Sequence, residues 1–300
     1  MRILITGGMG AIGSNLSTKL VNQGYKVYIL DNLDSAYPEN IEESKNLKII
    51  HGNICNDKVL EKSFSKGIDQ VYHLAANFAN QSSVDNPIKD LNTNGIGALK
   101  IFEYSKKYNV KKVLYTSTSC VYKASNEPYI ESFPIELTTP YSISKLLAEQ
   151  YLSFYNSFHK LPSIIVRFFN NYGPGEYPGR YRSVIPNFFW NALNGLPLKI
   201  YGSGEETRSF TYVSDTVDGA IKAMSYDNGI STNGFSFPMN EEQNFIFNIA
   251  NPTPITIKNL ALKINELCGN NAGIDFVKRR AWDILPHRSV SIKKAKESFD

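Results

Sequence analysis

Tyr141 and Lys145 are the residues whose types and spacing most clearly indicate chemistry, and they lie four positions apart in the segment 140–149. On a helix, residues four apart share one face, so the ammonium of Lys145 would lie beside the phenol of Tyr141. A free phenol titrates near ~10, and a neighbouring cation lowers this pKa. The pair therefore predicts a phenol that accepts a proton, next to a lysine that also binds a ribose hydroxyl.

A glycine-rich turn near the N-terminus supplies a second signal. The apolar run 2–6 is followed by Gly7, Gly10 and Gly13 and then by a helical pattern of apolar residues. A strand, a glycine turn and a helix in this order are typical of a pyrophosphate-binding segment. Gly7 would permit the tight turn, Gly10 would let the backbone approach the phosphates, and Gly13 would let the helix pack on its strand. The N-terminus of that helix would face the anion.

Asp31 follows the next apolar run, 25–30. A carboxylate at the end of this strand accepts hydrogen bonds from the adenosine ribose hydroxyls and repels a 2′-phosphate. The next Lys or Arg after Asp31 is Lys45. The sequence therefore predicts NAD, rather than NADP, as the cofactor.

Predicted strands and helices alternate over roughly the first 170 residues, which favours an α/β fold with a parallel sheet and helices on both faces. In such folds ligands gather at the carboxyl ends of the strands. Irregular loops are predicted over 173–179 and 230–242. The expected strands are 2–6, 25–30, 47–51, 70–74, 112–117 and 163–168, and the expected helices are 11–23, 57–65, 87–108 and 140–159.

The composition of the 300 residues excludes several functional classes. The net charge of +4 is mild and its basic residues are scattered, so no nucleic-acid or membrane partner is expected. Met1 leads directly into the first strand and no long apolar span is present, so we expect a cytoplasmic protein without a signal peptide. The cysteines are odd in number and, like the histidines, lack ligand spacing, so we expect reduced thiols and no metal.

The ordered motifs of this chain resemble those of the extended short-chain dehydrogenases/reductases of the nucleotide-sugar epimerase and dehydratase group. The resemblance covers nearly the whole chain. The matching stretches are TGGMGAIG (6–13), DN (31–32), HLAA (73–76), NTNG (92–95), TSTSCVY (116–122), YSISK (141–145), RFFNNYGP (167–174), YGSGEETRSFTYVSD (201–215) and RAWD (280–283).

The resemblance implies a Rossmann-type domain over 1–170, to which 205–235 would return. A smaller discontinuous α/β domain over 171–204 and 236–300 would bind a nucleotide-diphosphate sugar that is UDP-, GDP- or dTDP-linked. It implies Thr118, Tyr141 and Lys145 as catalytic residues. The implied NAD-binding residues are Gly7, Gly10, Ala11, Ile12, Gly13, Asp31, Asn32, Asn53, Ile54, Leu74, Ala75, Ala76, Asn94, Tyr141, Lys145 and Phe168. The implied substrate-binding residues are Asn77, Thr118, Ser119, Cys120, Asn170, Arg182, Val184, Arg208 and Arg280, of which Arg208 and Arg280 would clamp the diphosphate.

The resemblance also implies oxidation at C4 of the sugar, with Thr118 beside Tyr141 at the C4 oxygen. Dehydratases of the group carry Asp and Glu where this chain has Ser119 and Cys120, and the decarboxylating members keep a glutamate at the second position. A 4-epimerase, which needs neither carboxylate, is therefore the leading hypothesis.

Other C4-oxidising activities remain open: a 4-dehydrogenase or ketoreductase, a dehydratase, or a 3,5-epimerase that uses Cys120. In the GDP-mannose 3,5-epimerases a lysine pairs with the matching cysteine, and Arg182 takes its place here. A non-enzymatic NAD-sensing protein is a further alternative, although the presence of Thr118, Tyr141 and Lys145 argues against it.

Two departures from the group are visible. Asn53 replaces the usual aspartate at an adenine-contacting turn, and the chain stops at Asp300, where relatives usually continue into a further helix. In this group the helices corresponding to 87–108 and 140–159 form a bundle across a two-fold axis. The second segment also has more apolar residues than one sheet-facing stripe needs. We therefore expect a homodimer; the apolar residues concerned are Leu147, Tyr151, Phe154, Tyr155 and Phe158.

Overall fold

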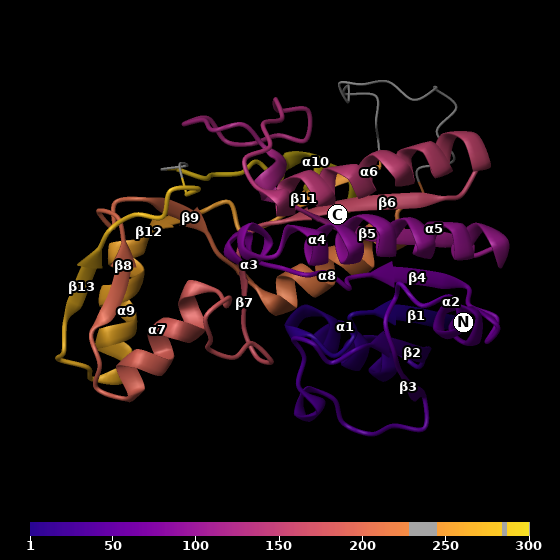
Figure 1. Cartoon of the computed structure of the whole chain (residues 1–300), viewed down its shortest axis with the longest axis horizontal. Coiled ribbons are helices and arrows are strands. Elements are labelled where there is room, and N and C mark those ends of the chain that lie inside the picture. Colours follow the sequence, from indigo (N-terminus) through magenta and orange to yellow (C-terminus); the bar gives the residue numbers. More distant parts are fainter. Residues whose placement is uncertain (228–244, 284–286, 300) are drawn as a thin grey trace.

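The computed structural model describes residues 1–227, 245–283 and 287–299. A parallel sheet of seven strands in the order β11-β6-β5-β4-β1-β2-β3 runs through the larger part of the molecule (Figure 1). The strands are β1 (Arg2–Thr6), β2 (Lys26–Asp31), β3 (Leu47–His51), β4 (Gln70–His73), β5 (Lys112–Thr118), β6 (Ser163–Phe168) and β11 (Ile246–Ile249). The predicted α/β fold with a doubly wound parallel sheet is confirmed.

Helices cover both faces of this sheet. From β1 the chain continues to β2 and β3 on one side, and it then crosses back to β4 on the other side of β1. Because the crossovers are right-handed, this reversal places the helices of the two halves on opposite faces of the sheet. One face carries α2 (Asp57–Phe64), α5 (Ala98–Lys107) and α6 (Pro140–His159). The other carries α1 (Ala11–Asn22), α8 (Val213–Ser225) and α10 (Lys293–Phe299).

Burial on both faces explains why the central strands are almost wholly apolar rather than alternating. The side chains of Leu4, Ile5, Ile29 and Val113 have no exposed surface. Burying a side chain of this size contributes about 1.5–3 kcal/mol of transfer free energy. This rigid core holds the carboxyl ends of the strands, and the loops that follow them, at one edge of the sheet.

The region 87–108 differs from the single helix that was predicted. It consists of α4 (Pro87–Asp90), the π-helical η2 (Leu91–Gly97) and α5, and it is preceded by α3 (Asn80–Asp85). Periodicity alone gave no indication of the wider π turn. Strand β11 was not predicted from the sequence, and the irregular loop expected over 230–242 lies outside the described residues.

A smaller unit packs beside the sheet, at the left of Figure 1. Its α7 (Val184–Leu193) and α9 (Ile257–Cys268) pack against β8 (Leu198–Tyr201), which pairs in parallel with β13 (Ile274–Val277). The remaining described elements are short: η1 (Pro38–Asn40), η3 (Ser119–Val121), β7 (Asn171–Tyr172), β9 (Thr207–Ser209), β10 (Thr211–Tyr212) and β12 (Pro254–Thr256).

The division into two domains remains a prediction, but two elements from the range 236–300 lie with the large sheet. β11 pairs with β6, and α10 packs against β11 and α8. The range 236–300 therefore contributes to both units.

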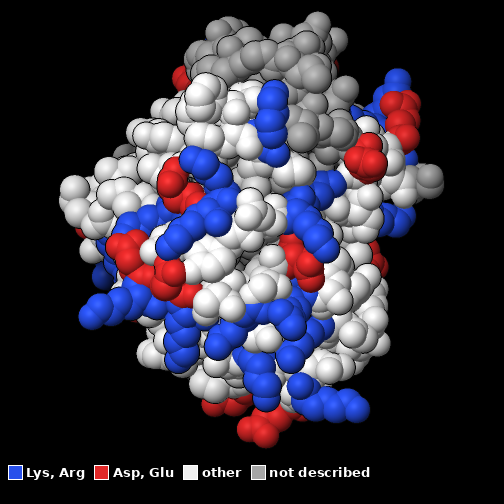
Figure 2. Space-filling view, turned by 90° about the vertical axis from the view of Figure 1, so that its right-hand side faces the viewer, with Lys and Arg blue, Asp and Glu red and all other residues white. Residues whose placement is uncertain are grey.

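The surface near α2 and α5 carries acidic side chains among a larger field of basic ones (Figure 2). Ion pairs join these two helices, for example Lys100 with Asp57 and Lys107 with Glu61. Among the residues that the structure describes, no helix is long and apolar enough to cross a membrane.

Candidate active site

The glycine turn after β1 forms a cradle that leaves no room for side chains at Gly7 and Gly13. Gly7 has φ of +69°, and a Cβ there would lie 2.7 Å from the backbone nitrogen of Ala75. A Cβ on Gly13 would lie 2.1 Å from the carbonyl oxygen of Gly7. A Cβ on Gly10 would meet only that same oxygen, at 3.4 Å, among the described residues. Gly10 therefore presents open backbone at the start of α1, as a bound diphosphate requires.

The carboxylate of Asp31 is fixed at the end of β2. Its two oxygens accept hydrogen bonds from the backbone N–H groups of Met9, at 3.0 Å, and Leu33, at 2.9 Å. Sequence reasoning missed a cation that reaches the same cavity: Lys89 of α4 pairs with Asp34 at 2.7 Å. Lys89 is thus engaged with a carboxylate, and Asp31 presents its own carboxylate to the same cavity.

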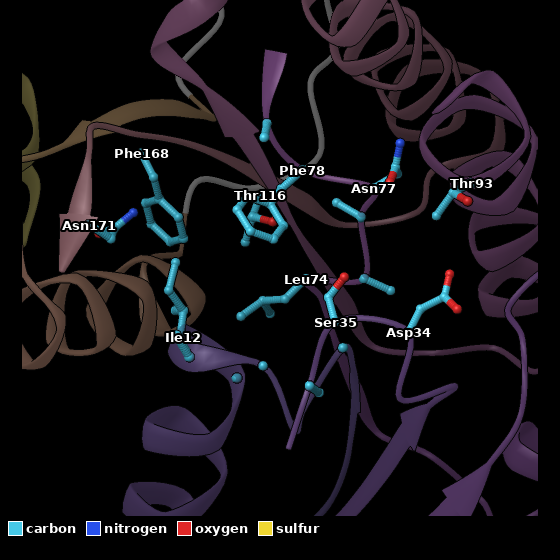
Figure 3. Close-up of a pocket in the computed structure, with 18 of the residues that line it drawn as sticks. Ile12, Asp34, Ser35, Leu74, Asn77, Phe78, Thr93, Thr116, Phe168 and Asn171 are labelled. Atoms are coloured by element: carbon cyan, nitrogen blue, oxygen red, sulfur yellow. The ribbon is translucent and has the colours of Figure 1, made fainter. Parts of the chain in front are cut away.

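One cavity at the carboxyl edge of the sheet brings most of the predicted site residues together. Figure 3 shows Ile12 and Phe168 on one side of it and Asp34 and Ser35 on another. The predicted residues that line it are Gly7, Gly10, Ala11, Ile12, Gly13, Asp31, Asn32, Asn53, Ile54, Leu74, Ala75, Ala76, Asn77, Thr118, Cys120, Tyr141, Lys145, Phe168, Asn170 and Arg182.

Five predicted residues lie outside the lining of this cavity: Asn94, Ser119, Val184, Arg208 and Arg280. Arg208 is buried and forms an ion pair with Asp283 at 3.2 Å. The Arg280 guanidinium stacks over the ring of Tyr201, 4.1 Å from its centroid. The two arginines expected to clamp a diphosphate are thus already engaged with protein groups.

Helix α6 positions the tyrosine and the lysine. It begins at Pro140 after the predicted cap, Thr139, whose hydroxyl accepts from the backbone N–H of Ser142 at 3.3 Å. Pro at the first helical position and Thr before it are typical of a well-defined helix start. The first turns of α6 therefore hold Tyr141 and Lys145 rigidly against the end of β5, where Thr118 lies.

The electrostatics of this pair differ from the prediction. Burial raises the pKa of Tyr141 above its usual value, the charge of Cys120 raises it further, and a hydrogen bond with Thr118 opposes the rise. Lys145, expected to lower that pKa, is not among the groups that shift it. Burial instead lowers the pKa of Lys145 itself to about 7, against the opposing charges of Glu149 and Asp90. Its ammonium lies 4.4 Å from the centroid of the Tyr115 ring.

A buried polar network behind the cavity explains the position of Asn94 in the π-helical turn. The side chain of Asn94 accepts from the backbone N–H of Asn77 at 2.8 Å and donates to its carbonyl at 3.0 Å. It also donates to Asp90 at 2.9 Å, and Asp90 accepts a hydrogen bond from Ser144 of α6. Burial raises the pKa of Asp90, while the Ser144 bond and the charge of Lys145 oppose this. Asn94 thus supports the wall of the cavity rather than lining it.

Cys120 has a partner that the sequence did not indicate. Nη1 of Arg288 donates to its Sγ at 3.4 Å, and Nδ2 of Asn80 donates to it at 3.6 Å. Burial raises the pKa of the thiol, but the charge of Arg288 and hydrogen bonds with Thr118, Asn80 and Arg288 outweigh it, so the net shift is downward. Arg182, which was expected at the place of the lysine of 3,5-epimerases, donates to the carbonyl of Ser35 at 2.6 Å.

The loop that follows β7 closes over the cofactor end of the cavity. Asn15 of α1 donates to the carbonyl of Pro174 at 2.9 Å, and Asn40 donates to that of Gly175 at 3.1 Å. The rings of Tyr37 and Tyr177 lie 4.0 Å apart between their centroids. We name residues 173–183 the strap, because they link the smaller unit to the loop after β2.

The sheet order, the glycine cradle, the acidic residue after β2 and the Tyr-Lys pair together define an NAD-dependent enzyme of the extended short-chain dehydrogenase/reductase type. The chain belongs to the NAD dependent epimerase/dehydratase family, whose sequence model matches residues 3–236. NAD is its cofactor.

Three similar proteins show the range within the family. An epimerase from Methanothermobacter thermautotrophicus is 42% identical, with a TM-score of 0.93 over all of this chain and 86% of the other. UDP-glucose 4-epimerase from Thermotoga maritima, solved with UDP-glucose, is 31% identical, with a TM-score of 0.89 over 99% and 92% of the chains. UDP-glucuronic acid decarboxylase 1 from Xenopus tropicalis is 33% identical over 98% of this chain, which spans 66% of that relative's length.

Proposed function

We propose that this protein is a nucleotide-sugar 4-epimerase. The observation that carries the proposal is the end of β5, where Thr118 lies with Tyr141 at the cavity wall while the next two positions are Ser119 and Cys120. Removal of water or carbon dioxide from the sugar would require an acid or base group beside the ketone, and these positions supply no carboxylate. Two of the similar structures are epimerases, which supports the same conclusion.

The residues of this chain would act on the sugar as follows. The hydroxyl of Thr118 binds the C4 oxygen, and Tyr141 takes the C4 hydroxyl proton and later returns it to the oxygen. Lys145 would bind the nicotinamide ribose through its ammonium. The chemistry that bound NAD would supply is reversible hydride transfer at C4. The glycine cradle, Asp31 and Phe168 would hold NAD in place, while the sugar ketone turns to present its other face.

Arg208 and Arg280 remain the proposed diphosphate ligands. A doubly charged diphosphate would compete for these guanidinium groups with their protein partners, which include Asp283 and the Thr207 carbonyl for Arg208 and the Tyr201 ring for Arg280. UDP-, GDP- and dTDP-linked sugars all present this group. A panel of the three, assayed for interconversion of the C4 epimers, would identify the nucleotide.

Hydrogen exchange tests the reaction itself. In a 4-epimerase the hydride never leaves the enzyme, so a product formed in heavy water should contain no carbon-bound deuterium. Mass spectrometry and proton NMR of the product would show this. Deuterium at C3 or C5 would instead establish a 3,5-epimerase.

A 3,5-epimerase is the second candidate, because one observation favours it. The lowered pKa of Cys120, at a cavity wall next to Tyr141, would suit a base that removes a proton next to a ketone. Cys120→Ala separates the candidates: a 4-epimerase keeps most of its turnover, whereas an enzyme that needs the thiolate loses it.

We also propose a homodimer through α6 and the segment 87–97. Four of the five apolar residues predicted on α6 are exposed, and only Tyr155 is buried, against Phe102. Exposed apolar residues of the neighbouring segment extend this surface: Ile88, Leu91 and Ile96. Light scattering should give twice the chain mass of 33.7 kDa. The double variant Leu147→Glu, Phe154→Glu should give the monomer mass, and a monomeric wild-type protein would contradict the proposal.

A further inference from the structure

Lys145 is a buried cation, and its charge depends on the groups around it. The side chain is 2% exposed, and burial lowers its pKa to about 7, while the charges of Glu149 and Asp90 oppose this. An ammonium carries three N–H donors, and it is this form that would hold the ribose hydroxyls. Since burial favours the neutral amine, a neighbouring negative charge is needed to keep the proton on Lys145 at neutral pH.

The first of the two carboxylates, Glu149, is already paired. Its oxygens accept from Nε of Arg167 at 3.0 Å and from Nη2 at 2.7 Å, and neither side chain has exposed surface. A guanidinium bound through two parallel hydrogen bonds offsets much of the charge that the carboxylate presents to a third group. Glu149 is therefore mainly the partner of Arg167.

The second carboxylate, Asp90, has only neutral hydrogen-bond donors. It ends α4, which packs against α6, and it has no exposed surface. The amide of Asn94 donates to its Oδ1 at 2.9 Å, and the hydroxyl of Ser144 donates to its Oδ2. Among the residues that the structure describes, the charged group that acts on Asp90 is Lys145. Asp90 thus supplies a negative charge that no closer cation offsets.

The other titratable groups near Lys145 keep one charge state between about pH 6 and 9. His73 is neutral there, because burial and the charge of Lys145 lower its pKa to about 3. Tyr115, whose ring centroid lies 4.4 Å from the ammonium, is also neutral, because burial raises its pKa well above the usual value. Burial likewise raises the pKa of Tyr141. Within this window Lys145 is therefore the member of this set that changes its charge.

We propose that Asp90 is a positioning residue, whose buried carboxylate keeps Lys145 an ammonium while Lys145 holds the nicotinamide ribose. Asp90 does not line the cavity, so it acts on the cofactor through Lys145. The inference rests on the proposed function in one respect, the role of Lys145 at the ribose. Because a nearby opposite charge favours the ionised form, loss of this carboxylate lowers the pH at which Lys145 releases its proton.

Calorimetric titration with NAD at several pH values tests this without any sugar. The dissociation constant of the wild-type protein should be level below about pH 7 and should rise above it, as Lys145 loses its proton. Asp90→Asn keeps the shape of the side chain and removes its charge, so the rise should begin on the order of one pH unit lower. At about pH 8 the variant should bind NAD ~10-fold more weakly than the wild-type protein, and at about pH 6 within ~2-fold of it.

Three further variants separate charge from structure. Ser144→Ala removes a hydrogen bond to the same carboxylate but keeps the charge, and Asp57→Asn removes an exposed charge on α2. Both should keep the pH at which the dissociation constant of the wild-type protein begins to rise. Asp90→Ser is a second neutral variant, and it should show the same shift as Asp90→Asn.

Two results would overturn the proposal: a loss of NAD affinity in Asp90→Asn that is equal at every pH, or a pH dependence that matches that of the wild-type protein. The first would make Asp90 a structural residue of the turn that begins η2. A wild-type affinity that is constant over the whole range would refute the role of Lys145 at the ribose as well. The epimerase is tested separately: the predicted shift in a protein that epimerises no nucleotide sugar would refute the reaction and leave the role of Asp90 standing.

Discussion

At the cofactor end of the cavity the glycine cradle is formed by the backbone of one short segment, whereas at the sugar end side chains from positions far apart in the sequence meet. Gly7, Gly10 and Gly13 lie within a single turn and helix start. Cys120 and Arg288 meet across 168 residues of sequence. A backbone cradle tolerates almost no change, while a side-chain constellation can be altered residue by residue. The first kind of site thus fixes the cofactor, and the second leaves the substrate open to variation.

The largest effect is expected where the two ends meet, at Tyr141. Tyr141→Phe should cut turnover by roughly 10²-fold or more, the usual scale for loss of a general acid–base group. NAD affinity should change little, because the phenol oxygen contributes little to cofactor binding. Steady-state kinetics and calorimetric titration would measure both. Tyr151→Phe, at an exposed tyrosine of the same helix, is the control; full activity in Tyr141→Phe would make Tyr141 a structural residue.

The cofactor end should respond to small changes in the backbone cradle. Gly13→Ala places a Cβ against the Gly7 carbonyl, so we expect the free energy of unfolding to fall by about 1–3 kcal/mol, as for other overpacked sites. Gly10→Ala should leave stability nearly unchanged but weaken NAD binding by at least ~10-fold, because the methyl group occupies the ligand's side. Urea denaturation and NAD titration of both variants test the difference. If both variants showed the same changes in stability and NAD affinity, Gly10 and Gly13 would not have these separate roles.

The cofactor choice is expected to depend on one charge. Asp31→Asn should narrow the preference for NAD over NADP by about 10-fold, because it removes the repulsion of a 2′-phosphate. Titration with each cofactor measures the ratio. Asp57→Asn, an exposed acid on α2, should leave it unchanged. An unchanged ratio in Asp31→Asn would move the discrimination to Asp34 and Lys89.

A pH dependence of stability is also expected, and it comes from Lys145. Its pKa of about 7 in the folded protein lies below its ordinary value near 10.5, so the unfolded chain binds more protons between these limits. Stability due to this group therefore rises as the pH rises from about 7 toward 10.5. Lys145→Met should stabilise the NAD-free protein relative to wild type at pH 7, with a difference that shrinks by pH 9.5. Urea midpoints at both pH values test this, and a constant difference would contradict it.

These contrasts explain what the sequence could and could not predict. The strands near Arg2, Lys26 and Ser163 follow from local apolar runs, and the cap at Thr139 follows from residue type alone. The π-helical turn at Asn94 depends on a bond to the backbone of Asn77, which no periodicity encodes. Arg288 lies 168 residues from Cys120 and belongs to no spaced motif in the sequence, so only the fold reveals that the two side chains are neighbours. The raised pKa of Tyr141 likewise reflects burial, which the sequence pattern underestimated.

The strap bears on how a reduced cofactor would be retained during the proposed reaction. It is bound to α1 through Asn15 and to the loop after β2 through Asn40, and several of its residues line the cavity. An epimerase borrows two electrons from C4 and must return them to the same sugar. A reduced cofactor that escaped would strand a ketone and leave the enzyme without the electrons needed to finish. In the proposed epimerase, a strap that retains the reduced cofactor would keep these two electrons within the protein until they return to the sugar.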